Sequence, residues 1–213
     1  MPEQLSRFER RKEETRREIL GAALACFAER GYHATGIADI VRRVGIAQGT
    51  FYLYFQSKRE IVEQILDDLM ERLSAALLDL PPSAPTSLAE YRDQAEHIST
   101  SLTGVLSADP QAARFLLLQA AAVDDDMAER VLAFYDAAAA IQATYLQHGI
   151  SAGYFRSDLD AGHAARAVNG MLLASAFYSL RDPSPAAFEQ LAHAVREILY
   201  YGLASDHHPQ IAD

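Results

Sequence analysis

The stretch GIADIVRRVGIAQGTFYLYF, residues 36–55, decides the fold of this chain. In its first half the apolar residues recur at helical spacing on one side, at Ile37, Ile40, Val41 and Val44. Gly45 then ends this helix, at a position where the left-handed turn suits glycine best. A second helix is predicted from about Ala47 to Phe55. Two short helices joined by a glycine turn are typical of the helix-turn-helix motif.

The second of these helices has two chemically different sides. At about 100° per residue, Phe51 and Phe55 turn toward the first helix and are predicted to be core. The side near the helix start is polar and suits a major groove, with Gln48, Gly49, Thr50 and Tyr52 and with Leu53 at its margin. A glutamine amide pairs with adenine and a threonine methyl contacts a thymine methyl, whereas a tyrosine hydroxyl reaches a phosphate oxygen. Tyr54 is either a DNA contact or a half-buried core residue.

The flanking segments supply further candidate DNA contacts. A helix predicted from about residue 15 to 30 precedes the motif, and Thr35 can cap the helix that follows. Lys58 lies in the first turn of the next helix, beside a free N-terminus that suits a phosphate. Near the start of the chain, Arg7, Arg10 and Arg11 could form an arm along the DNA backbone. Alternatively this run is a solvated helix with pairs such as Glu13 and Arg17.

Charge and composition limit the remaining possibilities. Residues 1–60 hold 11 basic and 8 acidic side chains, a net charge of +3, whereas residues 61–213 hold 8 basic and 21 acidic ones, a net charge of −13. An N-terminal part that can approach a polyanion is therefore expected. One cysteine, Cys26, and the absence of an export pattern or a spanning apolar run favour the cytoplasm.

The pattern beyond the motif is helical throughout, which predicts an all-α fold. A capping box, Ser57 with Glu60, opens a long helix that runs to about residue 80, and the stretch PPSAPTS (81–87) reads as a loop. Helices of roughly 88–107, 110–122, 126–150, 161–181 and 185–203 follow, giving nine in all. Residues 205–213 are expected to be disordered.

The segment GYHATGIADIVRRVGIAQGTFYLYFQSKREIVEQIL resembles the N-terminal domain of the TetR family of transcriptional regulators. The resemblance covers about residues 13–73 and implies a DNA-binding domain there, followed by an effector-binding and dimerisation domain over 74–205. It implies DNA contacts at positions that family members commonly use, namely Gln48, Gly49, Thr50, Tyr52, Tyr54 and Lys58, with Thr35 beside a phosphate. The chain departs from the family pattern at Ala47, where a capping Ser or Thr is frequent, at Gln48, where Lys is frequent, and at the bulkier Val41.

The resemblance also implies that the C-terminal helices dimerise. The helix over 162–180 mixes small and bulky residues, and the last helix carries an apolar stripe. We expect these two helices to meet their symmetry mates in a homodimer, because palindromic DNA sites require two-fold proteins. The predicted interface residues are Met171, Ala174, Phe188, Leu191, Val195, Ile198 and Leu199. The alternative is that these residues are intramolecular core.

An effector pocket is predicted from polar residues set among apolar helical faces. The candidates are Met70, His97, Arg114, Phe115, Leu118, Gln119, Phe134, Tyr135, Tyr145, Asn169, Phe177 and Tyr178. A mostly apolar pocket with few polar groups favours a lipophilic or aromatic effector, and an acyl-CoA is an alternative. Each polar residue could instead be a satisfied helix-packing contact.

The sequence thus predicts a DNA-binding repressor that a small molecule releases. The same fold acting as an activator, or as a repressor without an effector, is the alternative. An all-α enzyme is a remote one, because DDDMAE (124–129) loosely resembles an aspartate-rich metal site. Acidic residues in a first helical turn are expected from the helix dipole, so neither a metal nor a cofactor is predicted.

Overall fold

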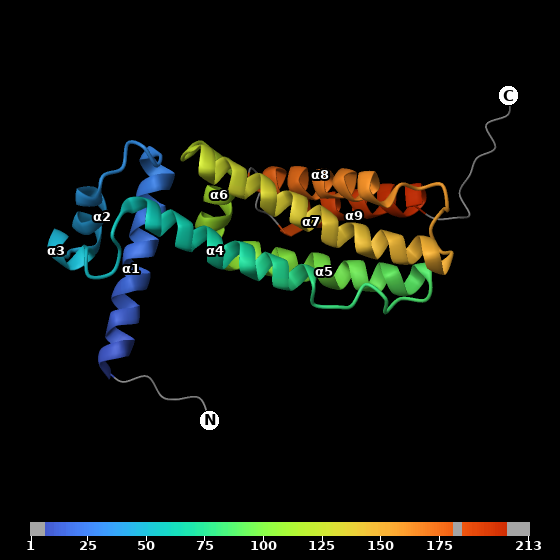
Figure 1. Ribbon diagram of the computed structural model, residues 1–213, viewed down its shortest axis with the longest axis horizontal. Coiled ribbons are helices and arrows are strands. Elements are labelled where there is room, and N and C mark those ends of the chain that lie inside the picture. Colours follow the sequence, from blue (N-terminus) through green and yellow to red (C-terminus); the bar gives the residue numbers. More distant parts are fainter. Residues whose placement is uncertain (1–6, 181–184, 204–213) are drawn as a thin grey trace. The chain divides into compact units, whose positions relative to one another are not determined.

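A computed structural model describes residues 7–180 and 185–203, without the side chains of residues 185–189 and 192. The described residues form nine α-helices and one 3-10 turn, which confirms the all-α prediction for this part of the chain (Figure 1). The elements are α1 (Arg7–Arg30), α2 (Ile37–Val44), α3 (Gln48–Phe51), α4 (Lys58–Leu77), α5 (Leu88–Ala108), α6 (Pro110–Leu118), η1 (Ala120–Ala122), α7 (Asp125–Ala152), α8 (Ala161–Ser179) and α9 (Pro185–Leu203).

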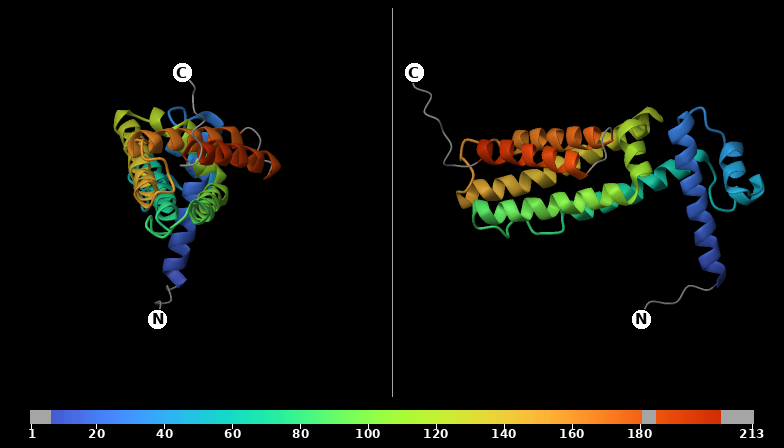
Figure 2. Two further views of the ribbon diagram at one scale, coloured as in Figure 1. Left: turned by 90° about the vertical axis from the view of Figure 1, so that its right-hand side faces the viewer. Right: turned by 180° about the vertical axis from the view of Figure 1, so that it is seen from behind.

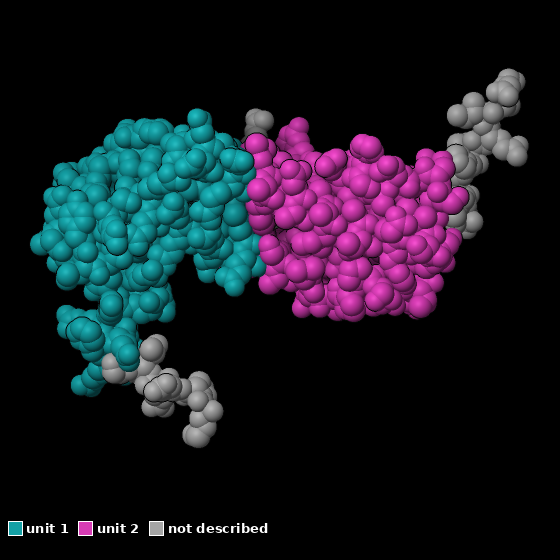
Figure 3. Space-filling view, in the orientation of Figure 1, with its two compact units in different colours: residues 1–71, 106–131 teal, residues 72–105, 132–213 magenta. Residues whose placement is uncertain are grey.

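The chain divides into two compact units (Figure 3). Unit 1 contains residues 1–71 and 106–131, and unit 2 contains residues 72–105 and 132–213. The first division lies close to the domain boundary expected between residues 73 and 74. Residues 106–131, which the sequence assigns to the second domain, pack instead with the N-terminal helices. The rings of Phe27 in α1 and Phe115 in α6 are 5.5 Å apart, and both side chains are buried.

Local hydrogen bonds explain where several helices begin. The carboxylate of Asp109 accepts from the Ala112 N–H at 2.9 Å, and that of Asp160 accepts from the His163 N–H at 2.8 Å. Both caps are where the sequence places them. At the start of α4, Ser57 accepts from the Glu60 N–H at 3.1 Å, as expected for a capping box. The Glu60 carboxylate, however, accepts from the N–H of Gln56 rather than from that of Ser57.

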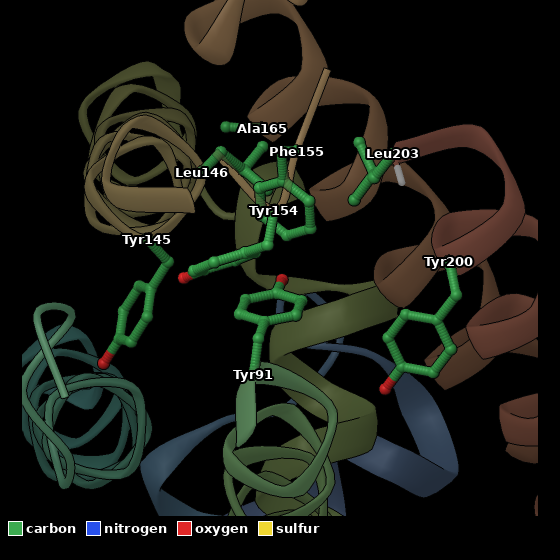
Figure 4. Close-up of a cluster of buried hydrophobic side chains, with 8 residues drawn as sticks. All are labelled: Tyr91, Tyr145, Leu146, Tyr154, Phe155, Ala165, Tyr200 and Leu203. Carbon is green, nitrogen blue, oxygen red and sulfur yellow. The ribbon is translucent and has the colours of Figure 1, made fainter. Parts of the chain in front are cut away.

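Unit 2 is a helical bundle in which α8 and α9 lie side by side (Figure 2). One part of its core is an aromatic cluster drawn from α5, α7, α8, α9 and the turn after α7 (Figure 4). The buried members are Tyr91, Tyr145, Leu146, Tyr154, Phe155, Ala165, Tyr200 and Leu203. Gly149 allows this packing, because a Cβ at that position would lie 2.2 Å from the Phe155 ring.

Candidate DNA-binding site

The turn between α2 and α3 sets the direction of the short helix α3. Gly45 adopts φ 81°, and its N–H donates to the Val41 carbonyl at 2.9 Å. The N–H of Ile46 donates to the same carbonyl at 3.1 Å. Only glycine takes this left-handed conformation without strain. The turn therefore depends on Gly45, as the sequence indicates.

Two phenylalanines anchor α3 from beneath. Phe51 is fully buried and Phe55 is 1% exposed, with their ring centroids 5.9 Å apart, which confirms their predicted core role. The helix is shorter than expected: it ends at Phe51, and residues 52–54 form a turn. Ala47 caps it without a side-chain hydrogen bond, because alanine has no acceptor to offer.

The opposite side of α3 and its turn is open to solvent. Gln48 and Gly49 are exposed, Tyr52 is 50% exposed, and Thr50 and Tyr54 are half-buried. The polar face predicted from the sequence is therefore available to a partner. Leu53, which the sequence places at the margin of this face, is 76% exposed.

Thr35 does not have the role that the sequence predicts. Its side chain is 2% exposed, and its hydroxyl lies 2.8 Å from the Gly31 carbonyl and 3.2 Å from that of Cys26. A buried hydroxyl that already donates to the end of α1 is out of reach of a phosphate. The N-cap of α2 is Gly36, whose N–H donates to the Asp39 carboxylate at 3.0 Å.

Asp39 holds the start of α2 electrostatically as well. Its carboxylate lies 3.1 Å from the guanidinium group of Arg30 and 3.4 Å from that of Arg42. The Gly36 N–H, followed by Arg30, lowers the pKa of Asp39 below its usual value. The charged form of this carboxylate is therefore the one that the folded chain stabilises.

Lys58 is engaged inside unit 1. Its ammonium group lies 2.6 Å from the Tyr32 carbonyl and 2.8 Å from the Thr35 carbonyl, and 4.0 Å from the centre of the Tyr32 ring. Burial lowers the pKa of Lys58. Two of its three N–H groups thus tie the start of α4 to the turn between α1 and α2. At most one N–H is left for a phosphate.

The basic residues at the start of α1 are open to solvent. Arg7, Arg10 and Arg11 are exposed and line one open concavity with Phe8 and Glu14. Burial in α1 begins only at Ile19. Further along, Arg17 pairs with Glu13 at 3.4 Å, as the alternative of a solvated helix predicts.

Residues 106–131 contact the DNA-binding helices through polar pairs that the sequence does not reveal. The His33 ring lies 2.9 Å from the Ala122 carbonyl, and Arg59 lies 3.2 Å from Asp124 and 3.4 Å from Asp126. Asp124 also caps α7 by accepting from the Met127 N–H at 2.9 Å. Asp124 and Asp126 of the DDDMAE segment thus have structural contacts. Within the described residues no group of three or more His, Cys, Asp or Glu could hold a metal ion.

The predicted pocket residues are divided between the two units. Unit 1 holds Met70, Arg114, Phe115, Leu118 and Gln119, and unit 2 holds His97, Phe134, Tyr135, Tyr145, Asn169, Phe177 and Tyr178. Several polar members already have protein partners. Tyr145 donates to the carbonyls of Leu77 and Leu80 at 2.7 and 2.6 Å, and Asn169 donates to the Tyr135 carbonyl at 3.0 Å.

Exposure separates the remaining pocket candidates. His97 lies at the surface, 2.6 Å from Asp79, and Tyr178 is 61% exposed, so neither side chain lines an interior cavity of its own unit. By contrast, the side-chain oxygen of Gln119 is buried and has no hydrogen-bond partner among the described atoms. Tyr145 and Asn169 already bond to backbone carbonyls, so the alternative of a satisfied packing contact fits these two residues better than a ligand contact.

The predicted dimer residues also differ in exposure. Ile198 is 62% exposed and Ala174 is exposed, whereas Met171, Leu191 and Leu199 are half-buried. Val195 is only 9% exposed, so its side chain belongs mainly to the core of its own unit. The side chain of Phe188 lies outside the described residues. Tyr178 and Tyr201, which the sequence analysis does not assign to the interface, add exposed aromatic surface on α8 and α9.

The fold and this site define a helix-turn-helix DNA-binding protein. The chain matches the family described as bacterial regulatory proteins, tetR family, over residues 19–65. It is 30% identical over 203 residues to the uncharacterized HTH-type transcriptional regulator YdgC of Bacillus subtilis (strain 168), with 89% of this chain and 93% of that protein covered. The chain therefore belongs to the TetR family of transcriptional regulators.

Two further comparisons extend over most of the chain. The HTH-type transcriptional repressor KstR2 of Mycobacterium tuberculosis (strain ATCC 25618 / H37Rv) is 27% identical over 195 residues, which cover 90% of this chain and 94% of that protein. The crystal structure of FadR from Bacillus subtilis in complex with stearoyl-CoA superposes with a TM-score of 0.64 at 21% identity, over 87% of this chain and 98% of that one. This second likeness shows the shared fold. Among the described helices, none is long and apolar enough to cross a membrane.

Proposed function

We propose that this regulator is a repressor that binds a palindromic operator as a homodimer and is released by a small lipophilic or aromatic effector. The observation that carries the proposal is the face of α3. Gln48, Gly49 and Tyr52 are exposed there, on a helix held from beneath by the buried Phe51 and Phe55. A rigid support under a polar face suits the reading of base edges in a major groove.

Each part of this surface has a distinct chemical role in the proposal. The Gln48 amide pairs with a base edge, and Thr50 and Tyr52 contact the edge of the groove and its phosphates. The exposed guanidinium groups of Arg7, Arg10 and Arg11 follow the DNA backbone. Because phosphate contacts release counterions, affinity should fall steeply as salt is added.

Dimerisation is proposed through α8 and α9. The exposed apolar side chains on these helices include Ile198, at 62% exposure, and Tyr178, at 61%. Large exposed apolar side chains that gather on one surface commonly mark an interface. A two-fold dimer would present two copies of α3 to two half-sites about one helical turn apart.

We propose that the protein works in the cytoplasm.

The effector is proposed to bind in the C-terminal helices. KstR2 is named a repressor, and the related FadR fold was crystallised with stearoyl-CoA, which supports a lipophilic effector here. Helices α4, α5 and α7 each contribute residues to both units, so an effector-induced change has a continuous backbone route between them. An effector needs a different affinity for the two states, typically about 1–3 kcal/mol, to shift the DNA-binding equilibrium.

The proposal is tested by DNA binding of the purified protein. Operators are selected from random duplexes, and affinity is measured by fluorescence anisotropy for the wild type, Gln48→Ala and Tyr52→Ala. Both variants should lose at least about fivefold in operator affinity, because each removes contacts worth roughly 1–3 kcal/mol. Gln147→Ala, which alters an exposed glutamine of α7 in unit 2, is the matched control. Unchanged operator affinity in both α3 variants would contradict the proposed docking.

A further inference from the structure

The connection between α4 and α5, residues 78–87, is held at its backbone by polar side chains of unit 2. The amide nitrogen of Gln94 in α5 donates to the Pro81 carbonyl at 2.9 Å. The ring of His148 in α7 lies 2.8 Å from the Pro85 carbonyl. The interior polar groups beside this connection are therefore mostly bound to backbone, which makes any unbound one conspicuous.

Two buried polar atoms in this part of unit 2 have no partner. The side-chain oxygen of Gln94 and the hydroxyl of Tyr154 make no hydrogen bond among the described atoms, although the two residues are only 5% and 8% exposed. Because the amide nitrogen of Gln94 is the donor to Pro81, the orientation of the amide is fixed and its unpartnered atom is an acceptor. Unpaired buried polar atoms are costly and rare in folded proteins. These two atoms therefore indicate that a polar partner binds here.

Shared neighbours place the two atoms around the same part of the core. Tyr91 precedes Gln94 by just under one turn of α5, and its ring centroid is 6.1 Å from that of Tyr154. Figure 4 shows the Tyr154 hydroxyl directed toward the side of the cluster where Tyr145 lies. The Tyr145 hydroxyl in turn bonds to the carbonyl of Leu80, the residue next to the one that Gln94 holds.

The charges near these hydroxyls are negative. Burial raises the pKa of the Tyr154 hydroxyl, and the charge of Glu90 raises it further. Burial and then the charge of Asp79 raise the pKa of Tyr145 in the same way. An anion placed among these side chains would be repelled by the two carboxylates.

A hydroxyl group has the complementary hydrogen-bonding capacity. It donates a proton, which suits the Gln94 oxygen, and it accepts one, which suits the Tyr154 hydroxyl as donor. A carboxylate only accepts, whereas an ammonium group only donates and loses solvation when it is buried. The rings of Tyr91 and Phe155 in the same cluster provide apolar surface for the rest of such a molecule.

We infer that Gln94 and Tyr154 bind the hydroxyl group of a lipophilic alcohol or phenol, and that this class of compound is the effector. The inference rests on the proposed release of the repressor by a small lipophilic or aromatic effector, and it names the polar group of that effector. A fatty-acid carboxylate does not fit, because it has no proton to donate to Gln94 and carries the same charge as Glu90.

Titration calorimetry of the purified full chain tests the inference with two matched sets of probes. The first is decanol, decyl methyl ether and decanoate, and the second is naphthol, methoxynaphthalene and naphthoate. Each ether keeps the oxygen but cannot donate, and each carboxylate is charged. The hydroxyl compound of each set should bind at least about fivefold more tightly than its ether and its carboxylate, because only the hydroxyl pairs the buried Gln94 oxygen.

Three variants separate the site from the general packing of the cluster. Tyr154→Phe removes a hydroxyl without a protein partner, so it should keep the wild-type melting temperature and bind the hydroxyl probes about two- to tenfold more weakly. Tyr145→Phe is the matched control, because its buried hydroxyl is bonded to Leu77 and Leu80; it should lose stability and keep the probe affinity. Gln94→Met should abolish the preference for hydroxyl over ether, a ratio that a general loss of stability does not change.

The contrary outcomes distinguish this inference from the proposed function. If neither hydroxyl probe binds, or each binds no more tightly than its ether and carboxylate, the inference is wrong. Equal effects of Tyr154→Phe and Tyr145→Phe on probe affinity would also overturn it. A hydroxyl probe that binds without weakening operator affinity would contradict the role as effector. Failure of the wild type to select any operator would instead overturn the proposed repressor function, and the probe affinities would still decide the site.

Discussion

Lys58 provides the sharpest test of how the DNA-binding helices are held together. Family resemblance places this residue against a phosphate, but its ammonium group lies 2.6 and 2.8 Å from the carbonyls of Tyr32 and Thr35. Lys58→Met keeps most of the aliphatic stem and removes the charge. If the main role of Lys58 is to join α4 to the turn after α1, this variant should lose stability before it loses phosphate contacts.

The expected magnitude follows from the contacts that the substitution removes. Hydrogen bonds to a charged group contribute about 1.5–3 kcal/mol each, and a cation–π contact at an exposed site about 0.5–1 kcal/mol. The two hydrogen bonds share one donor group, and the lowered pKa of Lys58 shows that burying the ammonium group costs solvation energy. We therefore expect a net loss of about 2 kcal/mol, below the sum of about 3.5–7 kcal/mol that these contacts would give separately. For a chain of this size it corresponds to a fall in melting temperature of about 4–8 °C.

Two measurements separate the positioning role from a phosphate contact. Thermal unfolding followed by circular dichroism should show the lower melting temperature. Operator affinity measured across a salt series should keep its slope, because no phosphate contact is lost. Arg92→Met is the matched control, because Arg92 lies 4.4 Å from the centre of the Tyr200 ring in unit 2. Its substitution shows how much stability is lost when a cation–π contact is removed without the two carbonyl hydrogen bonds of Lys58. An unchanged melting temperature together with a salt slope reduced by about one per half-site would refute this reasoning.

Three further substitutions test other parts of the structure. Gly149→Ala places a Cβ 2.2 Å from the Phe155 ring and should lower the free energy of unfolding by about 1–3 kcal/mol in thermal melts. Gly104→Ala in α5, whose Cβ would meet no atom within 4 Å, is the control and should not be destabilised. Equal melting temperatures for the two variants would contradict the packing. Tyr145→Phe removes the hydroxyl that donates to the carbonyls of Leu77 and Leu80, and urea unfolding should show a free energy of unfolding lower by about 1–3 kcal/mol. An unchanged free energy of unfolding would mean that these carbonyls find other partners. Asp39→Asn should lower the melting temperature at pH 7. The folded chain lowers the Asp39 pKa below 3.8, so the charged carboxylate stabilises the fold above that pH and this stabilisation is lost as the pH falls further. The difference in melting temperature between wild type and variant should therefore shrink in acid. A difference that stays constant would argue against a charge effect.

What the sequence predicts correctly depends on interactions between residues close in the chain. The turn at Gly45 and the caps at Asp109 and Asp160 each involve hydrogen bonds spanning three or four residues. The burial of Phe51 and Phe55 is predicted from their four-residue spacing, although only Phe51 lies within α3. Helical periodicity and local capping are properties of a short window, so they can be read directly.

The tertiary structure alone decided which partners the predicted surfaces meet. Thr35 and Lys58 have the positions that the family pattern expects, yet their polar groups bond to carbonyls of the turn at residues 31–35 and of α1. Tyr145 bonds to carbonyls 65 and 68 residues away, and residues 106–131 join the N-terminal unit through contacts such as Phe27 with Phe115. Periodicity shows which face of a helix is buried but carries no information on what covers it. The buried partner is chosen by the packing of the whole unit, because every polar group taken out of water must find its hydrogen bond there.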